Sequence, residues 1–362
     1  MNNKIWVEKY RPTDISKIVN QDEIKLFIEG AIREKNIPHL LLYGSPGTGK
    51  TTIINILIKS LYTYTNNEFP DKFTLFEENR KLKSDRVLSL NASDERGIKV
   101  IREKIKTFAN LAIIQSSKDV NIPPFKVIVL DEADAMSSDS QFALRRIMEK
   151  YSTTTRFILI CNYVTKIIAP LASRCSKFRF QPINYSGSKE TIEYILQKEG
   201  YKIILSDEIY NYIYNNTNGD MRKTITLFQR LNYIGYINDL TIDKVREVIG
   251  EIPDDIINNL ISLLNNKITI QNQINIYKEI KNIISNGFNC LLLLNHLYNN
   301  YINDIIDDKI KGKIIIKLSE IDNRLNEGSI EIIQLTDLLF TINGLVNGIN
   351  YKITNNPFNI TV

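Results

Sequence analysis

Cysteine, histidine and tryptophan are scarce in this chain of 362 residues, which has three cysteines, two histidines and one tryptophan. The cysteines, Cys161, Cys175 and Cys290, lack the C-x-x-C spacing of a metal site, and two histidines are too few to complete a zinc site with them. This cysteine usage excludes a disulfide framework and predicts a reducing, intracellular environment.

Long apolar runs are also missing, so the sequence predicts no membrane-spanning helix. The N-terminal stretch "MNNKIWVEKYRP" has no apolar core of a secretory signal peptide. The formal net charge of +5 permits a nucleic-acid partner, but a solvated surface explains such an excess equally well.

Short apolar runs alternate with amphipathic helical stretches between residues 39 and 182. This alternation predicts a parallel sheet with helices on both faces. The expected strands are residues 39–44, 86–91, 125–132, 155–162 and 176–182. The polar stretch 63–86 is expected to be a loop or an insertion.

The strand signal fades after residue 184, and the rest of the chain is expected to be helical. Three short helices are predicted up to residue 250, followed by a linker at residues 250–253. The later helices are apolar on more than one face and therefore require burial. Three domains are thus expected: an α/β domain, a small helical domain and a C-terminal helical bundle, at residues 1–183, 184–250 and 251–362.

A glycine-rich motif, "GSPGTGKT", follows the first expected strand and precedes a helix. It fits the phosphate-binding pattern G-x-x-x-x-G-K-[ST], in which backbone N–H groups and a helix N-terminus surround phosphate oxygens. Lys50 is expected to reach the β- and γ-phosphates of ATP, and the Thr51 hydroxyl to bind Mg²⁺. The expected nucleotide-binding residues of this loop are Gly44, Ser45, Pro46, Gly47, Thr48, Gly49, Lys50, Thr51 and Thr52.

Polar residues at the ends of two other expected strands support a catalytic site. Asp131 ends an apolar strand and can hold Mg²⁺, and Glu132 can activate the attacking water. Asn162 ends the strand "FILICN", where its amide can position that water or contact the γ-phosphate. Arg222 lies with Lys223 in a first helical turn, where a bound anion would offset their repulsion from the helix dipole. An exposed basic turn is the alternative for the last pair.

With these motifs the chain resembles the small subunits of eukaryotic and archaeal replication factor C, the AAA+ clamp loaders. The resemblance covers roughly residues 5–250 and includes "WVEKYRP", "LNASDERGI", "VIVLDEADAM", "ALRRIMEKYS", "PLASRCSKFRF" and "GDMRK". It implies an AAA+ P-loop NTPase domain with a parallel sheet, a helical lid domain and an all-helical collar domain. Two departures are Ser45, where the family usually has proline, and the long 63–86 stretch.

The resemblance also implies roles for residues outside the phosphate loop. Val7 and Arg11 would lie near the base, and Val19 would line an apolar adenine site, although both valines fit a plain core role equally well. In the family "SRC" carries an arginine finger, so Arg174 would reach the γ-phosphate held by a neighbouring subunit. Cys175 is expected to be a small, partly buried residue beside it.

A helix from about Ile98 is expected to carry a DNA-contacting edge. Its apolar stripe consists of Ile98, Ile101, Ile105 and Phe108. Lys99, Arg102 and Lys106 lie on a neighbouring face, and the resemblance places them against DNA phosphates, without base readout. A solvated helix face is the alternative. The segment 108–115 is expected either to dock on the clamp or to belong to the core.

The function implied is that of an ATPase subunit of a sliding-clamp loader. Its cofactors would be ATP and Mg²⁺, and its partners the other subunits of a hetero-pentamer, a ring-shaped clamp and primer–template DNA, with no membrane. Its location would be the nucleus, or a cytoplasmic replication site in an archaeal or viral source. Two alternatives stay open: a non-hydrolysing scaffold subunit, and another AAA+ motor that remodels DNA.

Overall fold

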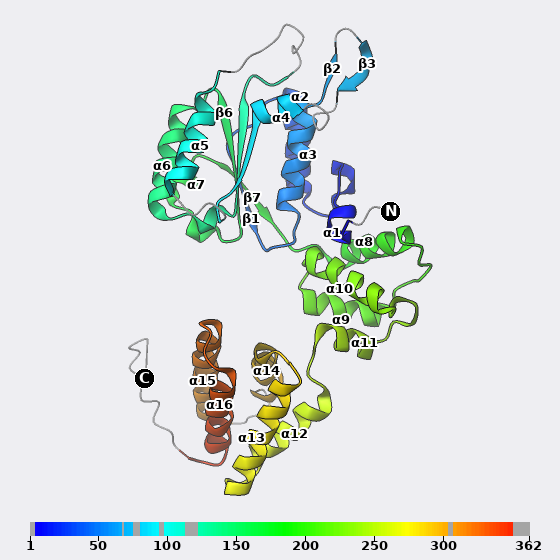
Figure 1. Ribbon diagram of the computed structural model, residues 1–362, viewed down its shortest axis with the longest axis vertical. Helices are drawn as coiled ribbons and strands as arrows, with labels where there is room; N and C mark the ends of the chain where they lie inside the picture. The colour runs from blue at the N-terminus through cyan, green and yellow to red at the C-terminus, as the bar shows by residue number, and fades with distance from the viewer. Residues whose placement is uncertain are drawn as a thin grey trace. The chain divides into compact units, whose positions relative to one another are not determined.

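The computed structural model describes residues 4–66, 69–74, 80–93, 98–112, 122–302 and 307–349. The contacts among them group the chain into two compact units, Met1–Ile242 and Asp243–Val362. The first unit holds the sheet and the helices up to α10, and the second holds the later helices (Figure 1). The expected division into three domains stays a prediction.

A five-stranded parallel sheet is the centre of the first unit. Its order is β4-β5-β6-β1-β7, and every neighbouring pair runs parallel. The strands are β1 (Leu40–Gly44), β4 (Val87–Asn91), β5 (Lys126–Asp131), β6 (Thr155–Cys161) and β7 (Ser176–Phe180). All five predicted strands are therefore confirmed, because each predicted apolar run forms one strand of this sheet.

Helices cover both faces of this sheet, as predicted (Figure 1). α2 (Asp22–Glu34) and α3 (Lys50–Tyr62) lie on one face, and α5 (Ile98–Asn110), α6 (Ser138–Lys150) and α7 (Ala169–Ala172) lie on the other. Alternate residues of β1 enter opposite cores, because Leu40 and Leu42 pack in the cluster under α3 whereas Leu41 packs in the cluster under α6. Burial on both faces accounts for the unbroken apolar runs of the strands.

The stretch 63–86 is more regular than a loop, so that expectation is wrong in part. It contains the antiparallel strands β2 (Tyr64–Asn66) and β3 (Phe69–Thr74), followed by α4 (Arg80–Arg86). Pro70 in β3 has no backbone N–H to donate. A two-stranded sheet tolerates this because both of its strands are edge strands, but in a sequence a proline argues against a strand. The α4 sequence, RKLKSDR, has no apolar repeat that would indicate a helix.

The region after the sheet has one helix more than the three predicted up to residue 250. The missed helix is α8 (Tyr185–Lys198), and the predicted ones are α9 (Asp207–Thr217), α10 (Met221–Ile234) and α11 (Ile242–Ile249). Glycine and serine fill the first turn of α8, which hid its helical pattern. Gly187 is required there, because a Cβ would lie 2.1 Å from Cγ1 of Val19.

Short helical segments connect these elements. The N-terminal helix α1 (Trp6–Lys9) packs against α10. The remaining segments are the 3-10 turns η1 (Ile15–Lys17), η2 (Ala133–Ala135), η3 (Val164–Lys166) and η4 (Ile237–Asp239).

The second unit is helical throughout its described residues, which confirms the predicted all-helical C-terminal domain. Its helices after α11 are α12 (Asp254–Asn265), α13 (Ile270–Ser285), α14 (Cys290–His296), the π-helical turn η5 (Leu297–Tyr301), α15 (Asp308–Asn326) and α16 (Glu331–Val346). Leucine and isoleucine from all five α-helices form one buried core. These helices therefore bury much of their apolar surface against one another, within the chain.

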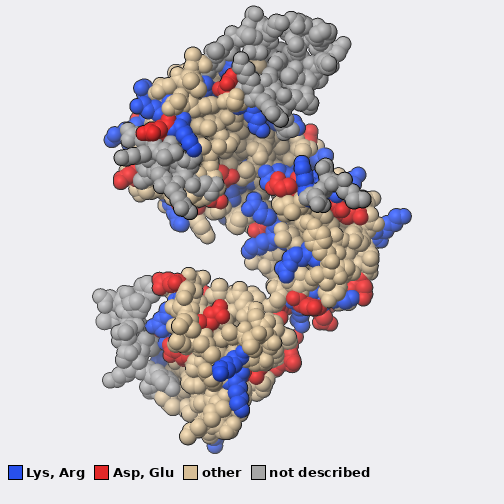
Figure 2. Space-filling model, viewed as in Figure 1, with Lys and Arg blue, Asp and Glu red and all other residues tan. Residues whose placement is uncertain are grey.

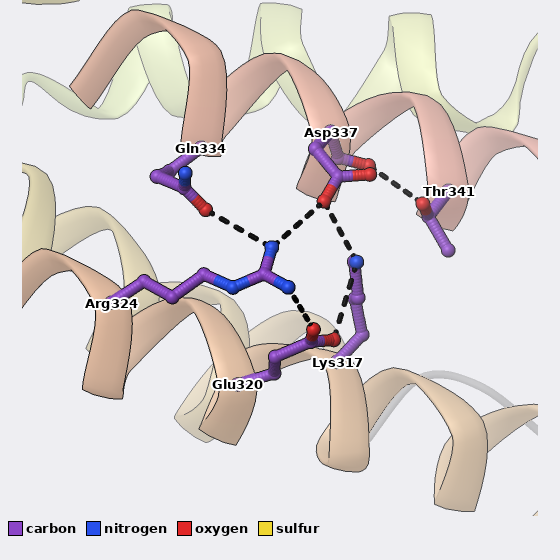
Figure 3. Close-up of polar contacts among 6 residues, drawn as sticks. All are labelled: Lys317, Glu320, Arg324, Gln334, Asp337 and Thr341. Atoms are coloured by element: carbon purple, nitrogen blue, oxygen red, sulfur yellow. Dashed lines mark hydrogen bonds and ion pairs between the residues drawn. The ribbon is translucent and has the colours of Figure 1, made fainter. Parts of the chain in front are cut away.

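Ion pairs join α15 to α16 beside that core (Figure 3). Lys317 Nζ lies 2.7 Å from Oδ2 of Asp337 and 3.3 Å from Oε2 of Glu320. Arg324 pairs with the same two carboxylates and donates to Oε1 of Gln334 at 3.4 Å. Because Lys317 and Glu320 are mostly shielded from water, with side chains 15% and 18% exposed, this network fixes how the two helices face each other.

The structure also bears on the expectations from composition. Cys161, Cys175 and Cys290 are buried free thiols, so none forms a disulfide. Across the described part of the chain, no helix is long and apolar enough to cross a membrane. Basic and acidic side chains are interspersed over the face in view, on both units (Figure 2). Net charge alone therefore does not identify a nucleic-acid surface on that face.

Candidate nucleotide-binding site

The glycine-rich loop joins the end of β1 to the start of α3. Gly47 and Gly49 have φ values of +71° and +92°, which residues with a side chain rarely adopt. Gly49 is the N-cap of α3, so the positive end of the helix dipole opens toward the loop. A Cβ at Gly47 would lie 1.8 Å from Oδ1 of Asp220, which shows how closely the N-terminus of α10 approaches the loop.

Lys50, the first residue of α3, is buried, with 7% of its surface exposed. Its Nζ donates to the carbonyl oxygens of Gly44 and Ser45 at 2.8 Å each and to Oδ1 of Asn162 at 3.0 Å. These acceptors are neutral, and among the described residues no carboxylate forms an ion pair with this ammonium group. Burial lowers the pKa of Lys50.

The oxygen groups predicted to hold Mg²⁺ lie beside one another. Thr51 Oγ1 donates a hydrogen bond to Oδ2 of Asp131 at 3.0 Å. Glu132 follows in a left-handed conformation with φ of +54°, and its N–H donates to Oδ1 of Asp131 at 3.0 Å. A strained backbone at a carboxylate facing a cavity is typical of functional sites.

Asn162 follows β6, which lies between β5 and β1 in the sheet. The carboxyl ends of these parallel strands meet at one edge of the sheet, and this brings Asn162 between Asp131 and the loop. Oδ2 of Asp134 accepts hydrogen bonds from the N–H groups of Asn162 at 3.3 Å and Tyr163 at 3.1 Å. Asp134 therefore fixes the turn that presents Asn162, a role that the sequence interpretation missed although it quoted "LDEAD".

Helix α10 presents Arg222 to the same cavity. Oδ1 of Asp220 accepts from the N–H groups of Arg222 at 2.9 Å and Lys223 at 3.1 Å, so it caps the helix. Arg222 is exposed on the described chain and lines the cavity together with Met221 and Ile225. Ile225 is three residues after Arg222, so helical spacing alone could have indicated it.

One cavity collects most of the predicted nucleotide residues. Its lining includes Val7, Arg11, Val19, Pro46, Gly47, Thr48, Gly49, Lys50, Thr51, Thr52, Asp131, Glu132, Asn162 and Arg222. Gly44 and Ser45 are outside this lining, and their carbonyls hold Lys50 instead. The sequence interpretation missed Tyr10, Pro12, Lys17, Ile18, Ile53, Ile183, Thr191, Met221 and Ile225. Thr191 lies on the unpredicted helix α8, which explains its omission.

The chemistry of this cavity fits a nucleotide with Mg²⁺. A helix N-terminus and a buried ammonium group, whose hydrogen-bond acceptors in the described part of the chain are neutral, favour an anion at the loop. Thr51 and Asp131 provide hard oxygen ligands, and Mg²⁺ usually takes few protein ligands and completes its shell with phosphate oxygens and water. The side chains of Val7, Ile18 and Val19 give the cavity an apolar surface that suits a base, beside the cationic side chains of Arg11 and Lys17.

Comparison with known proteins identifies the family of the chain. Residues 40–183 match the ATPase family associated with various cellular activities (AAA), and residues 252–341 match the replication factor C C-terminal domain. Replication factor C subunit 2 of Saccharomyces cerevisiae is 40% identical over 349 residues, which cover 94% of this chain and 93% of that protein. The chain belongs to the replication factor C small subunits.

Further relatives have similar coverage. Replication factor C subunit 4 of Homo sapiens is 39% identical and covers 93% of this chain and 87% of its own length. The replication factor C small subunit of Archaeoglobus fulgidus is 39% identical, with 92% and 95% covered. Among solved structures, the Thermotoga maritima RuvB Holliday junction branch migration motor has a TM-score of 0.49 at 15% identity, over 70% of this chain and 79% of that one. The AAA match and the replication factor C relatives show that this chain is an ATPase of the AAA family, and its NTPase domain is built on the parallel sheet described above.

Arg174 of this replication factor C subunit is outside the lining of its own cavity. It precedes β7, which runs parallel to β1 with Ser176 level with Leu40 and Phe180 level with Gly44. Arg174 therefore lies at the edge of the sheet formed by the amino-terminal ends of the strands. The edge formed by their carboxyl ends, which carries the loop, is about 13 Å away along the strand direction. It donates to the carbonyl of Pro170 at 2.7 Å and pairs with Glu149.

Cys175 lies beside Arg174 and is 9% exposed. Burial raises the pKa of its thiol to about 12, so it stays protonated and is a poor nucleophile. Over the described residues, no cluster of histidine, cysteine and carboxylate side chains could hold a metal. The burial of Cys175 matches the expectation of a small, partly buried residue beside Arg174.

Helix α5 carries the predicted DNA-contacting residues. Ile105 and Phe108 are buried and Lys106 is exposed, as the predicted faces require. The side chains of Lys99 and Arg102 lie outside the described residues, as do residues 113–115 of the segment proposed for the clamp. Lys126, 1% exposed, donates to the carbonyls of Phe108 at 2.7 Å and of Leu111, and so fixes the C-terminal end of α5 on the sheet.

Proposed function

We propose that this chain is an ATP-hydrolysing subunit of a sliding-clamp loader, which helps to open a ring-shaped clamp and place it on primer–template DNA during replication. The observation that carries the proposal is one cavity in which Lys50, Asp131, Glu132 and Asn162 converge, while Arg174 lies at the other edge of the sheet. Membership of the replication factor C small subunits supports the clamp-loading role.

The residues of the cavity have distinct roles in this proposal. Lys50 exchanges its neutral acceptors for the β- and γ-phosphate oxygens of ATP. Thr51 and Asp131 hold Mg²⁺, which when bound neutralises charge on those oxygens. Glu132 takes a proton from the attacking water, and Asn162 orients that water or the γ-phosphate. Val7, Arg11 and Val19 surround the base, and Arg222 contacts the phosphates from α10.

Arg174 acts in trans in this proposal. Its position at the opposite edge of the sheet keeps it away from the ATP of its own subunit, which supports a role toward the ATP of a neighbour. Glu149 and the Pro170 carbonyl hold the guanidinium in one orientation, which reduces the ordering that a finger must undergo when the neighbour docks. The active site is then complete only in an assembly, which we propose is a hetero-pentamer that works in the nucleus, or at the replication site of an archaeal or viral source.

The decisive experiment is to purify the chain with its partners from its own source and to identify them by mass. The complex is expected to contain other replication factor C subunits and, with ATP, to transfer the source's ring-shaped clamp onto primed circular DNA. Transfer should fail without ATP. A complex that hydrolyses ATP on DNA but never transfers a clamp would support a different AAA motor.

Helix α5 provides a separate prediction about DNA. Replacing Lys99, Arg102 and Lys106 together with glutamine should weaken DNA binding by the assembled complex and flatten its dependence on salt, with little change in sequence preference. The measurement is the slope of log affinity against log salt concentration, with Lys59→Gln on α3 as the control. An unchanged slope would mean that this face of α5 is only solvated.

A further inference from the structure

The first described residues are attached to the helices after the sheet. We call residues 6–12 the N-terminal strap. The backbone N–H of Trp6 donates a hydrogen bond to Oε1 of Gln229 on α10 at 3.0 Å, and this bond is buried. Trp6 and Gln229 are 5% and 7% exposed. Nε2 of Gln229 in turn donates to the hydroxyl of Tyr233 at 3.0 Å, so both ends of the amide are used.

A second anchor lies at the end of α8. Oε1 of Glu199 accepts from Nζ of Lys9 at 2.7 Å and from the hydroxyl of Tyr10 at 2.6 Å. The side chain of Glu199 is 19% exposed and that of Lys9 is 39% exposed, so Glu199 is the more shielded partner of this ion pair. The strap is therefore held at two points, and both belong to helices that follow the sheet.

Strap residues next to these anchors line the nucleotide cavity. Val7 follows Trp6, and Arg11 follows Tyr10, so anchoring residues and cavity residues are neighbours in the chain. Thr191 of α8 and Ile225 of α10 line the cavity from the same helices that hold the strap. The end of the cavity away from the phosphate loop is thus built on α8 and α10, through Gln229 and Glu199.

We propose that Gln229 and Glu199 are positioning residues for the nucleotide base, because they fix the strap so that Val7 and Arg11 face it. Neither residue lines the cavity, so each acts through the strap. This inference rests on the proposed function and deepens it, since it assigns base recognition to the strap and its anchors and phosphate recognition to the loop. Without Oε1 of Gln229, the buried backbone N–H of Trp6 would have no hydrogen-bond acceptor, and this favours release of the strap.

The test compares two ligands on the full chain, MgATP and inorganic tripolyphosphate with Mg²⁺. Tripolyphosphate has no base, so it reports on the phosphate loop alone. Gln229→Leu and Glu199→Gln are each expected to weaken MgATP binding by about tenfold and to leave tripolyphosphate binding unchanged. Glu190→Gln, an exposed carboxylate on α8, is the matched control and should change neither.

Trp6 provides an independent readout, because it is the only tryptophan of the chain. Its emission should shift to longer wavelength and become more accessible to acrylamide in both variants, without ligand and with the helical circular dichroism unchanged. An equal loss for both ligands would mean that the anchors only support the fold, and this would overturn the inference. Variants that bind MgATP like the wild type would overturn it as well, whereas a wild type without affinity for MgATP would overturn the proposed nucleotide site itself.

Discussion

Replacing Lys50 with alanine is expected to lower the affinity for MgATP by about a hundredfold. The ammonium group is buried at the N-terminus of α3, where its hydrogen-bond acceptors among the described residues are the carbonyls of Gly44 and Ser45 and the amide of Asn162. A bound triphosphate would supply the negative charge that these neutral acceptors lack. Titration of each variant with a fluorescent ATP analogue measures the effect.

Two further variants separate binding from chemistry in the same experiment. Lys59→Ala, near the other end of α3, should bind MgATP like the wild type. Glu132→Gln should also retain binding but lower the turnover of the assembled complex by about 10²–10⁴-fold, because an amide cannot accept the proton of water. Wild-type affinity in Lys50→Ala would contradict the phosphate-loop assignment, and normal turnover in Glu132→Gln would favour another residue as the base.

The sheet and the phosphate end of the site could be predicted because their signals are local. Strands buried on both faces read as unbroken apolar runs, and the bounds of β1 and β5 differ from the prediction by only one residue at an end. Asp131 ends such a run, and the loop that carries Lys50 and Thr51 follows another, so parallel strands bring these residues to one edge. Local pattern and topology together were therefore enough to bring these residues into one site.

The base end of the site could not be predicted in the same way, because long-range contacts build it. Helix α8 has serine and glycine in its first turn, and the packing of Gly187 against Val19 explains the glycine. Gln229 contacts Trp6, 223 positions away, and nothing in either local sequence marks the pair. The approach of Asp220 to Gly47 is also invisible in the sequence, since it depends on how α10 closes over the loop.

Replacing Arg174 with alanine is expected to leave the ATP affinity of this chain nearly unchanged and to suppress hydrolysis at the adjacent subunit by about 10³-fold or more. The chain supplies Lys50, Asp131 and Glu132 to its own cavity, whereas Arg174 lies at the edge of the sheet where β7 begins. A cation there stabilises phosphoryl charge only when a neighbouring subunit presents its nucleotide. The measurement is DNA- and clamp-stimulated turnover in a mixed assembly in which only that neighbouring site is competent.

Two controls make this test specific to the guanidinium group. Arg174→Lys keeps the charge but loses the planar fork that binds phosphate through two bonds, so it should restore only a small part of the turnover. Lys177→Ala removes an exposed cation from β7 close by and should have little effect. Assembly must be checked in each case by size-exclusion chromatography, because Arg174 also pairs with Glu149 on α6. If an intact assembly carrying Arg174→Ala turns over ATP at the neighbouring site as fast as the wild type, Arg174 is an interface charge and another residue completes that site.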